Sequence, residues 1–256
     1  MTTGATQTTV DIDPAEWGPD GVYSFKARVV DAAGNLGTFS FTKTVTVALS
    51  ATLSTLSDGV VNSSERMQTT TATVSHAALG AGWTVQLYRD STLVKTVSVT
   101  AGATSTAIPV TNSDWGTEGT HSFTARLVSP ASVVRTTAAR DVIVDYTAPD
   151  AASLALGVIA GDDTVTAIER QQSADAIVTH AAAETGERIN LYRDGVLVKS
   201  IAVTAAATST ALSFAESDWG SDGSHAFTVS LVDAAGNVSA QSAARTVTVS
   251  LSLIHI

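Results

Sequence analysis

Four aspartates offer the clearest opportunity for chemistry in this sequence. Asp145 and Asp150 stand at the two ends of an Asp-Tyr-Thr-Ala-Pro-Asp segment, and Asp162 and Asp163 follow a short distance later. Calcium takes six to eight oxygen ligands from carboxylates, carbonyls and water, and aspartates in turns supply them readily. The pattern predicts Ca²⁺ bound by Asp145, Asp150, Asp162 and Asp163. The alternative is four ordinary turn residues that hydrogen-bond their local backbone. No Asp-x-Asp-x-Asp-Gly loop decides between the two.

The histidines do not indicate catalysis. His76 recurs as His180 and His121 as His225, and Tyr23 occupies the position of His121 in an earlier copy. A general base would not tolerate that exchange, whereas a position on a sheet surface does. Serines are abundant and the acids fall in turns, so no Ser-His-acid triad is specified. We therefore expect structural packing for both histidine pairs, no catalytic residues, and a protein that is not an enzyme.

The tryptophans are candidate platforms for carbohydrate. Trp115 and Trp219 recur in Ser-Asp-Trp-Gly segments at strand boundaries, which favours buried core anchors. Trp83 differs, because the equivalent residue of the next copy is Glu187, so the fold does not require this ring and we expect it to be exposed. With Tyr88, it would provide the contacts of an alternative function, a carbohydrate-binding accessory module of a secreted glycoside hydrolase.

These residues are positioned by an internal repeat. Trp17, Trp115 and Trp219 are 98 and 104 residues apart, a period that corresponds to one small domain. The offset of 104 carries Gln86-Leu-Tyr-Arg-Asp90 onto Asn190-Leu-Tyr-Arg-Asp194. We predict the end of a truncated repeat at 1–48 (copy 1), complete repeats at 49–147 (copy 2) and 148–250 (copy 3), and independent folding of each complete copy.

Within each copy, the hydrophobic pattern has a period of two. Thr84-Val-Gln-Leu-Tyr-Arg and Thr246-Val-Thr-Val-Ser alternate as half-buried strands do. Asp194-Gly195 predicts a tight hairpin with positive φ at both residues, and Asp90-Ser91 is a weaker version of it. About seven short strands per copy predict an all-β protein made of tandem immunoglobulin-like β-sandwich domains.

Composition narrows the classes of partner. Apolar residues make up 44% of the chain but aromatic residues only 5%, so the cores must consist mainly of Val, Ala, Leu and Ile. The net charge of −10 argues against nucleic acid, which requires clustered Lys and Arg. Without cysteine there is no disulfide or thiolate metal site. No apolar run reaches transmembrane length, so we expect no membrane insertion in this segment. The terminal residues 251–256 match the translation of a sequencing adapter, and we expect them to be an artefact.

Several motifs together resemble the bacterial Ig-like repeats of very large surface adhesins. They are Leu-Tyr-Arg-Asp-Gly at 191–195, Trp-Gly-x-x-Gly at 219–223, Asp-Ala-Ala-Gly-Asn at 233–237 and Asp-x-Thr-Ala-Pro at 145–149. The resemblance implies an extended extracellular stalk, often stiffened by calcium between domains, that holds an adhesive module away from the cell. Copy 2 departs from the pattern, since Ser129-Pro-Ala-Ser-Val133 replaces the Asp-Ala-Ala-Gly-Asn loop.

The leading hypothesis is therefore a structural stalk segment of a bacterial cell-surface or secreted adhesin. Its expected partners are the neighbouring Ig-like repeats of the same chain. A host or surface ligand would be bound through modules outside this fragment.

Overall fold

The computed structural model of the chain describes residues 7–10, 21–47, 50–172 and 174–250. It has two compact units. Unit 1 comprises Met1–Val60 and Arg66–Val144, and unit 2 comprises Val61–Glu65 and Asp145–Ile256. Trp17 and the suspected adapter segment 251–256 lie outside the described residues. Independent folding of residues 49–147 and 148–250 stays a prediction.

Copy 2 forms a sandwich of two sheets. One sheet has the strand order β3-β5-β8, and the other has the order β4-β11-β9-β6-β7, with β10 paired to β9. The strands are β3 (Ala51–Leu53), β4 (Val60–Val61), β5 (Thr70–His76), β6 (Thr84–Arg89), β7 (Thr92–Ser98), β8 (Ser105–Val110), β9 (Gly119–Val128), β10 (Val134–Thr136) and β11 (Arg140–Val144).

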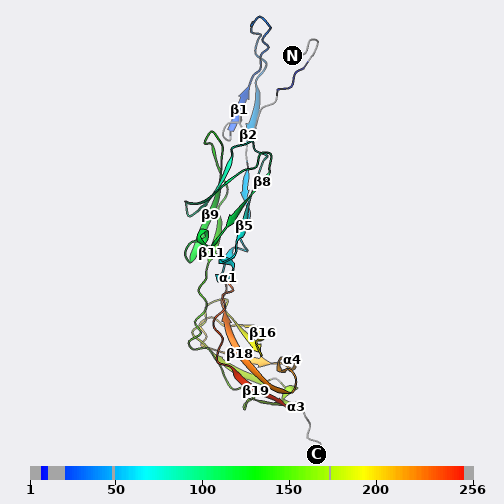
Figure 1. Cartoon of the computed structure of the whole chain (residues 1–256), viewed down its shortest axis with the longest axis vertical. Helices are drawn as coiled ribbons and strands as arrows, with labels where there is room; N and C mark the ends of the chain where they lie inside the picture. The colour runs from blue at the N-terminus through cyan, green and yellow to red at the C-terminus, as the bar shows by residue number, and fades with distance from the viewer. Residues whose placement is uncertain (1–6, 11–20, 48–49, 173, 251–256) are drawn as a thin grey trace, which may run out of the picture. The chain divides into compact units, whose positions relative to one another are not determined.

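Copy 3 repeats this arrangement, and its strands β16, β18 and β19 are marked in Figure 1. Its sheets have the orders β12-β14-β17 and β13-β19-β18-β15-β16. Strand β13 pairs with β19 in parallel, and the other pairings are antiparallel. The strands are β12 (Ala155–Leu156), β13 (Thr164–Thr166), β14 (Ala174–Thr179), β15 (Arg188–Arg193), β16 (Val196–Ala202), β17 (Ser209–Phe214), β18 (Gly223–Val232) and β19 (Arg245–Ser250). The prediction of an all-β chain of immunoglobulin-like sandwiches is confirmed.

The described part of copy 1 contains one antiparallel pair, β1 (Gly21–Phe25) and β2 (Lys43–Val47). Its register reproduces that of β18 and β19 in copy 3, since Gly21 lies opposite Val47 as Gly223 lies opposite Val249. Between the two strands the backbone also matches: Gly37 N donates to Val29 O at 2.8 Å, as Ser239 N donates to Leu231 O at 2.9 Å. Val29 is 53% exposed, whereas the equivalent Leu231 is 2% exposed. The described part of copy 1 therefore has the backbone of the repeat, but at Val29 it lacks the burial of the copy 3 core.

Alternating residues build the cores, as the period of two predicts. In β8, Thr106, Ile108 and Val110 are buried while the residues between them are exposed. Pro109 fits here because β8 pairs only with β5 and so lies at a sheet edge, where a missing N–H is tolerated. The predicted hairpin turns are also confirmed. Both Asp194 and Gly195 have positive φ, at 50° and 80°.

In the part of the chain that the structure describes, four one-turn helices interrupt the strands: α1 (Ser63–Arg66), α2 (Asn112–Trp115), α3 (Ala167–Arg170) and α4 (Glu216–Trp219). In α4, Asp218 Oδ2 accepts from the backbone N–H of Ala215 at 2.8 Å and pairs with Lys199 at 2.5 Å. This closes the turn and directs the next residue, Trp219, into the core, where it is fully buried. Trp115 is buried in the same way, which confirms the prediction of core anchors. Among the described residues, none of the helices has the length and apolarity needed to cross a membrane.

Candidate functional site

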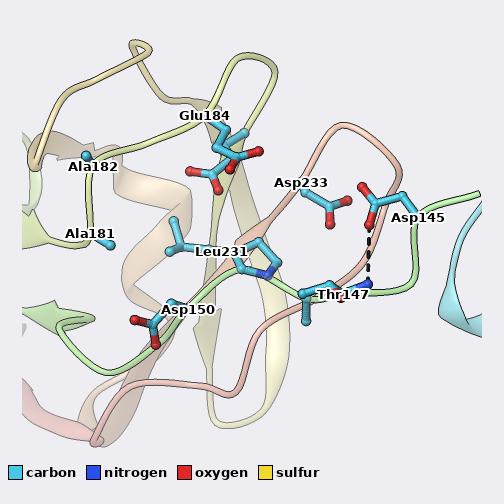
Figure 2. A pocket seen from close by; sticks show the side chains of 11 residues that line it. Asp145, Thr147, Asp150, Ala181, Ala182, Glu184, Leu231 and Asp233 are labelled. Atoms are coloured by element: carbon cyan, nitrogen blue, oxygen red, sulfur yellow. Dashed lines mark hydrogen bonds between the residues drawn. The ribbon is translucent and has the colours of Figure 1, made fainter. Parts of the chain in front are cut away.

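Two of the four predicted calcium ligands line one pocket of unit 2 (Figure 2). Asp145 and Asp150 share it with three further acids, Glu184, Glu187 and Asp233, around a volume of ≈ 420 Å³. Figure 2 shows the carboxylates of Asp145 and Asp233 facing each other, while Asp150 and Glu184 enter from other sides. Five carboxylates around one space produce a negative potential that attracts cations.

Local hydrogen bonds hold three of these acids in place. Asp145 and Asp150 each accept from the backbone N–H two residues later, at 3.2 Å and 2.8 Å. Asp233 accepts from the backbone N–H of Asn237 at 2.8 Å and from its side-chain amide at 2.9 Å. These are the turn contacts expected for ordinary aspartates. They occupy only part of each carboxylate's capacity, because an ionised carboxylate offers about four acceptor positions.

Glu187 is the most deeply buried acid of the pocket. It is only 7% exposed, and no described residue donates a hydrogen bond to its carboxylate. Its carboxylate oxygens are not among the fully buried atoms that lack a partner, so they face the open space of the pocket, where a cation could reach them. Glu187 is therefore the feature of this pocket that points most directly to a ligand.

Asp162 and Asp163 do not line the pocket. They lie between β12 and β13, where Asp162 accepts from the backbone N–H of Thr164 at 2.9 Å. Asp163 accepts from the backbone N–H of Ile159 at 2.9 Å and pairs with Arg245 at 2.7 Å. The structure thus brings together two of the four predicted ligands. Within the described ranges, no three His, Asp or Glu side chains are grouped closely enough, as they stand, to hold a metal ion.

The three additional acids were missed by reasoning from single motifs, although the repeat contains a signal for them. At the offset of 104, copy 2 has no acid at any of these positions. Gly80, Trp83 and Ser129 stand where copy 3 has Glu184, Glu187 and Asp233. Three coordinated differences at one end of the sandwich indicate a local specialisation of copy 3.

In copy 2, the equivalent space is filled by Trp83. The ring is 3% exposed and borders a residual cavity of ≈ 10 Å³, together with Leu79 and Leu127. The expectation that Trp83 is exposed is therefore wrong, because this position belongs to the core even though the two copies fill it differently. The ring of Tyr88 is covered by the guanidinium of Arg126, 4.1 Å from the ring centroid.

The histidines make structural contacts within the sandwiches. His180 is 3% exposed, with Nδ1 2.7 Å from the carbonyl of Ala181 and Nε2 2.9 Å from the hydroxyl of Thr210. A neutral ring satisfies both contacts if Nδ1 carries the proton and the threonine donates to Nε2. His76 makes the same contacts in copy 2.

His225 lies between two acceptors. Its Nδ1 is 2.6 Å from Asp194 Oδ2, and its Nε2 is 2.9 Å from the carbonyl oxygen of Ser221. Both ring nitrogens must donate to satisfy both contacts, and only the imidazolium does so. The other Asp194 oxygen accepts from the backbone N–H of Ala226 at 2.9 Å. This charged contact fixes the β15–β16 hairpin to the start of β18, and His121 lies against Asp90 in the same geometry in copy 2.

The protonation of His225 should make the stability of copy 3 depend on pH. The hydrogen bonds to Asp194 and then to Ser221 raise the pKa of His225 above its ordinary value of 6.5, against the opposing effects of partial burial and then of the charge on Arg193. A raised pKa means that the stabilisation is complete below the unfolded value and is lost as the pH rises through the folded value. We expect urea denaturation between pH 5.5 and 9 to show this loss. His225→Tyr introduces the residue that copy 1 has at the equivalent position, and it should reduce this loss of stability with rising pH. Identical pH profiles for the two proteins would contradict the assignment.

Comparison with known proteins gives distant matches. No protein-family model matches the chain. Exoglucanase B of Cellulomonas fimi is 29% identical over 250 residues, and the match covers 88% of this chain and 20% of the enzyme. The chain thus spans about one fifth of the length of that relative.

Solved structures with a similar chain path include two bacterial adhesins. One is a Ca²⁺-stabilised adhesin that helps an Antarctic bacterium to bind ice (22% identity, TM-score 0.42, 90% of this chain and 57% of that chain). Another is a 1.5-MDa bacterial ice-binding adhesin (23% identity, TM-score 0.39, 91% and 76%). The fibronectin(III)-like modules of Clostridium thermocellum CbhA are also similar (11% identity, TM-score 0.45, 79% and 94%).

Proposed function

We propose that the chain is a structural, non-enzymatic stalk segment of a bacterial cell-surface or secreted adhesin. The observation that carries this proposal is the repetition of a whole sandwich together with its stabilising contacts. Arg89 donates to the carbonyl of Asp114 at 2.6 Å, and in the next copy Arg193 donates to that of Asp218 at 2.7 Å. Copying a complete domain increases properties that grow with the number of domains, such as the length of a stalk or the spacing between its ends.

The contacts shared by the copies are suited to resisting force. The arginine connects the hairpin strand to the one-turn helix that carries the buried tryptophan, and the His–Asp contact connects the same hairpin to the following strand. Cross-links between elements distant in sequence keep a sandwich closed when its ends are pulled. The test is force spectroscopy on the full chain, in which two sandwiches should unfold in two similar events.

The location and partners follow from this proposal. A stalk segment lies outside the cell, its immediate partners are the neighbouring repeats of the same chain, and any host or surface ligand is bound by modules elsewhere in the protein.

A second candidate is an accessory module of a secreted glycoside hydrolase, and the similarity to exoglucanase B favours it. The residues expected to contact carbohydrate do not favour it, because Trp83 is buried and the ring of Tyr88 is covered by Arg126. If the chain belongs to such an enzyme, the structure supports a spacer between modules better than a sugar-binding surface. Binding of soluble cello-oligosaccharides to the chain would favour the accessory module over the stalk.

We further propose that the acidic pocket of unit 2 binds Ca²⁺. Asp145 and Asp150 are the predicted ligands retained from the sequence, and Glu187, the least exposed acid of the pocket, adds a third carboxylate. The acids must converge by side-chain rotation, since no three of them are grouped at ligating distance as they stand. An ion bound there would fix the Asp145–Asp150 segment, whose flexibility Pro149 already limits.

Calcium should raise the melting temperature of the full chain, because a ligand that binds only the folded state stabilises it by mass action. We expect Asp145→Asn with Asp150→Asn to abolish the rise. Glu187→Trp, which restores the residue of copy 2, should do the same. Asp162→Asn is the matched control and should retain the response, because its side chain lies outside the pocket. An unchanged melting temperature at millimolar calcium, or loss of the response in the control alone, would contradict this site.

A further inference from the structure

A loop in unit 2 that contributes Asp233 to the acidic pocket also makes a separate contact with a one-turn helix. The docking loop, Asp233–Asn237, contacts the capped turn, Asn62–Glu65, which also belongs to unit 2. Asn237 is 1% exposed, and its Oδ1 accepts from the backbone N–H of Ser63 at 2.8 Å. The side-chain amide of Asn62 donates to the carbonyl of Ala235 at 3.1 Å. The two segments therefore exchange hydrogen bonds in both directions.

The capped turn leaves one donor for the loop. A helix begins with backbone N–H groups that have no partner inside the helix. Asn62 Oδ1 accepts from Ser64 N at 3.0 Å and from Glu65 N at 2.9 Å, and Glu65 Oε2 accepts from Asn62 N at 3.1 Å. Ser63 N–H is the group that this internal cap does not satisfy, and the Asn237 oxygen accepts from it. The docking loop thus completes the cap from outside the helix.

The docking loop is shaped in advance for this role. Asp233 accepts from both the backbone and the side chain of Asn237, which orients the Asn237 oxygen toward Ser63. Gly236 has a φ of +91°, and a Cβ at this position would come within 3.3 Å of the Asn62 amide nitrogen. Glycine at this position therefore permits both the turn and the close approach of Asn62.

Copy 1 contains the same loop, and no described residue occupies it. In Asp31–Asn35, the aspartate accepts from the backbone N–H of Asn35 at 2.8 Å and from its side-chain amide at 2.7 Å. All five residues are exposed, and no described residue donates to Asn35 Oδ1. The loop thus adopts its shape without a capped turn, so the contact in unit 2 is not needed to form it.

We propose that the Asp-x-x-Gly-Asn loop is a recognition site whose partner is a capped turn of the type Asn-x-x-Glu. By the sequence offset, the turn belongs to copy 2 and the loop to copy 3, so the pair specifies which segment precedes a given repeat. Copy 2 cannot act as such a receptor, because Ser129-Pro-Ala-Ser-Val133 lacks both the aspartate and the asparagine. The inference is independent of calcium and of the adhesin role.

Amide hydrogen exchange of the full chain, followed by NMR in EDTA, tests this recognition. Asn237→Ala should accelerate exchange at Ser63 roughly tenfold, as expected for losing one hydrogen bond. Asn35→Ala is the matched control, because it removes the equivalent side chain from the copy 1 loop, which has no described partner. It should leave the exchange rate of the Ser63 amide unchanged. Asn62→Asp keeps the acceptor oxygen of the internal cap but cannot donate a hydrogen bond to the carbonyl of Ala235. It should therefore accelerate amide exchange at Ser63, while the amide of Glu65 stays protected.

Two results would overturn the proposal. One is unchanged exchange at Ser63 in Asn237→Ala. The other is equal acceleration in Asn237→Ala and Asn35→Ala, which would show a general effect of the substitution. If Asn237→Ala disturbs unit 2 as a whole, amides throughout β18 will also accelerate, and Asn62→Asp then decides, because it leaves the docking loop intact.

Discussion

Trp219→Ala should lower the free energy of unfolding of the copy 3 sandwich by about 3–5 kcal/mol, the range for truncating a large buried aromatic residue. Trp219 is fully buried, its ring stacks on Phe214 at 4.7 Å between centroids, and it meets the edge of Phe227 at 6.4 Å. Its indole nitrogen has no hydrogen-bond partner among the described residues, so the substitution removes packing alone. Urea denaturation followed by circular dichroism measures the loss.

Two variants separate packing from other effects. Trp219→Phe keeps an aromatic ring against Phe214 and should cost less than the alanine variant. Trp115→Ala should weaken the copy 2 transition and leave that of copy 3 in place. A cost below about 1 kcal/mol for Trp219→Ala would mean that the ring is not a core anchor, since burial of a large side chain is worth more than that.

The strands, the hairpin turns and the buried tryptophans could be predicted because each leaves a local signal. Alternation in β8 and β17, and positive φ at Asp194-Gly195, follow from neighbouring residues alone. The one-turn helices could not, because four residues are too few to show a helical period. Each depends on the acid at its third position closing the turn: Asp114 and Asp218 in α2 and α4, and Glu65 and Glu169 in α1 and α3.

The candidate site was only partly predictable, because it is assembled from separate segments. Asp162 and Asp163 are close in sequence to Asp150, yet Arg245 and local N–H groups engage them outside the pocket. Glu187 comes from the start of the β15 hairpin region, and only tertiary packing places it beside Asp150. Comparison of the copies also explains why Trp83 is buried although Glu187 stands at the same position in copy 3. This position belongs to the core, and it holds an aromatic ring in copy 2 and a carboxylate that faces a pocket in copy 3.

Copies 2 and 3 should carry force as two separate sandwiches. Each should release about 30 nm of chain when it unfolds, because roughly 100 residues extend at about 3.5 Å each, less the folded end-to-end distance. The hydrogen bonds from Arg193 and the His225–Asp194 pair must break as copy 3 opens, so each event should be abrupt.

Single-molecule force spectroscopy on the full chain tests this claim most directly. We expect two abrupt events of about 30 nm each, and Trp219→Ala should lower the force of one event while leaving the other unchanged. One combined event of twice that length, a gradual extension without events, or a fall in both forces in Trp219→Ala would show that the two copies do not unfold as separate sandwiches.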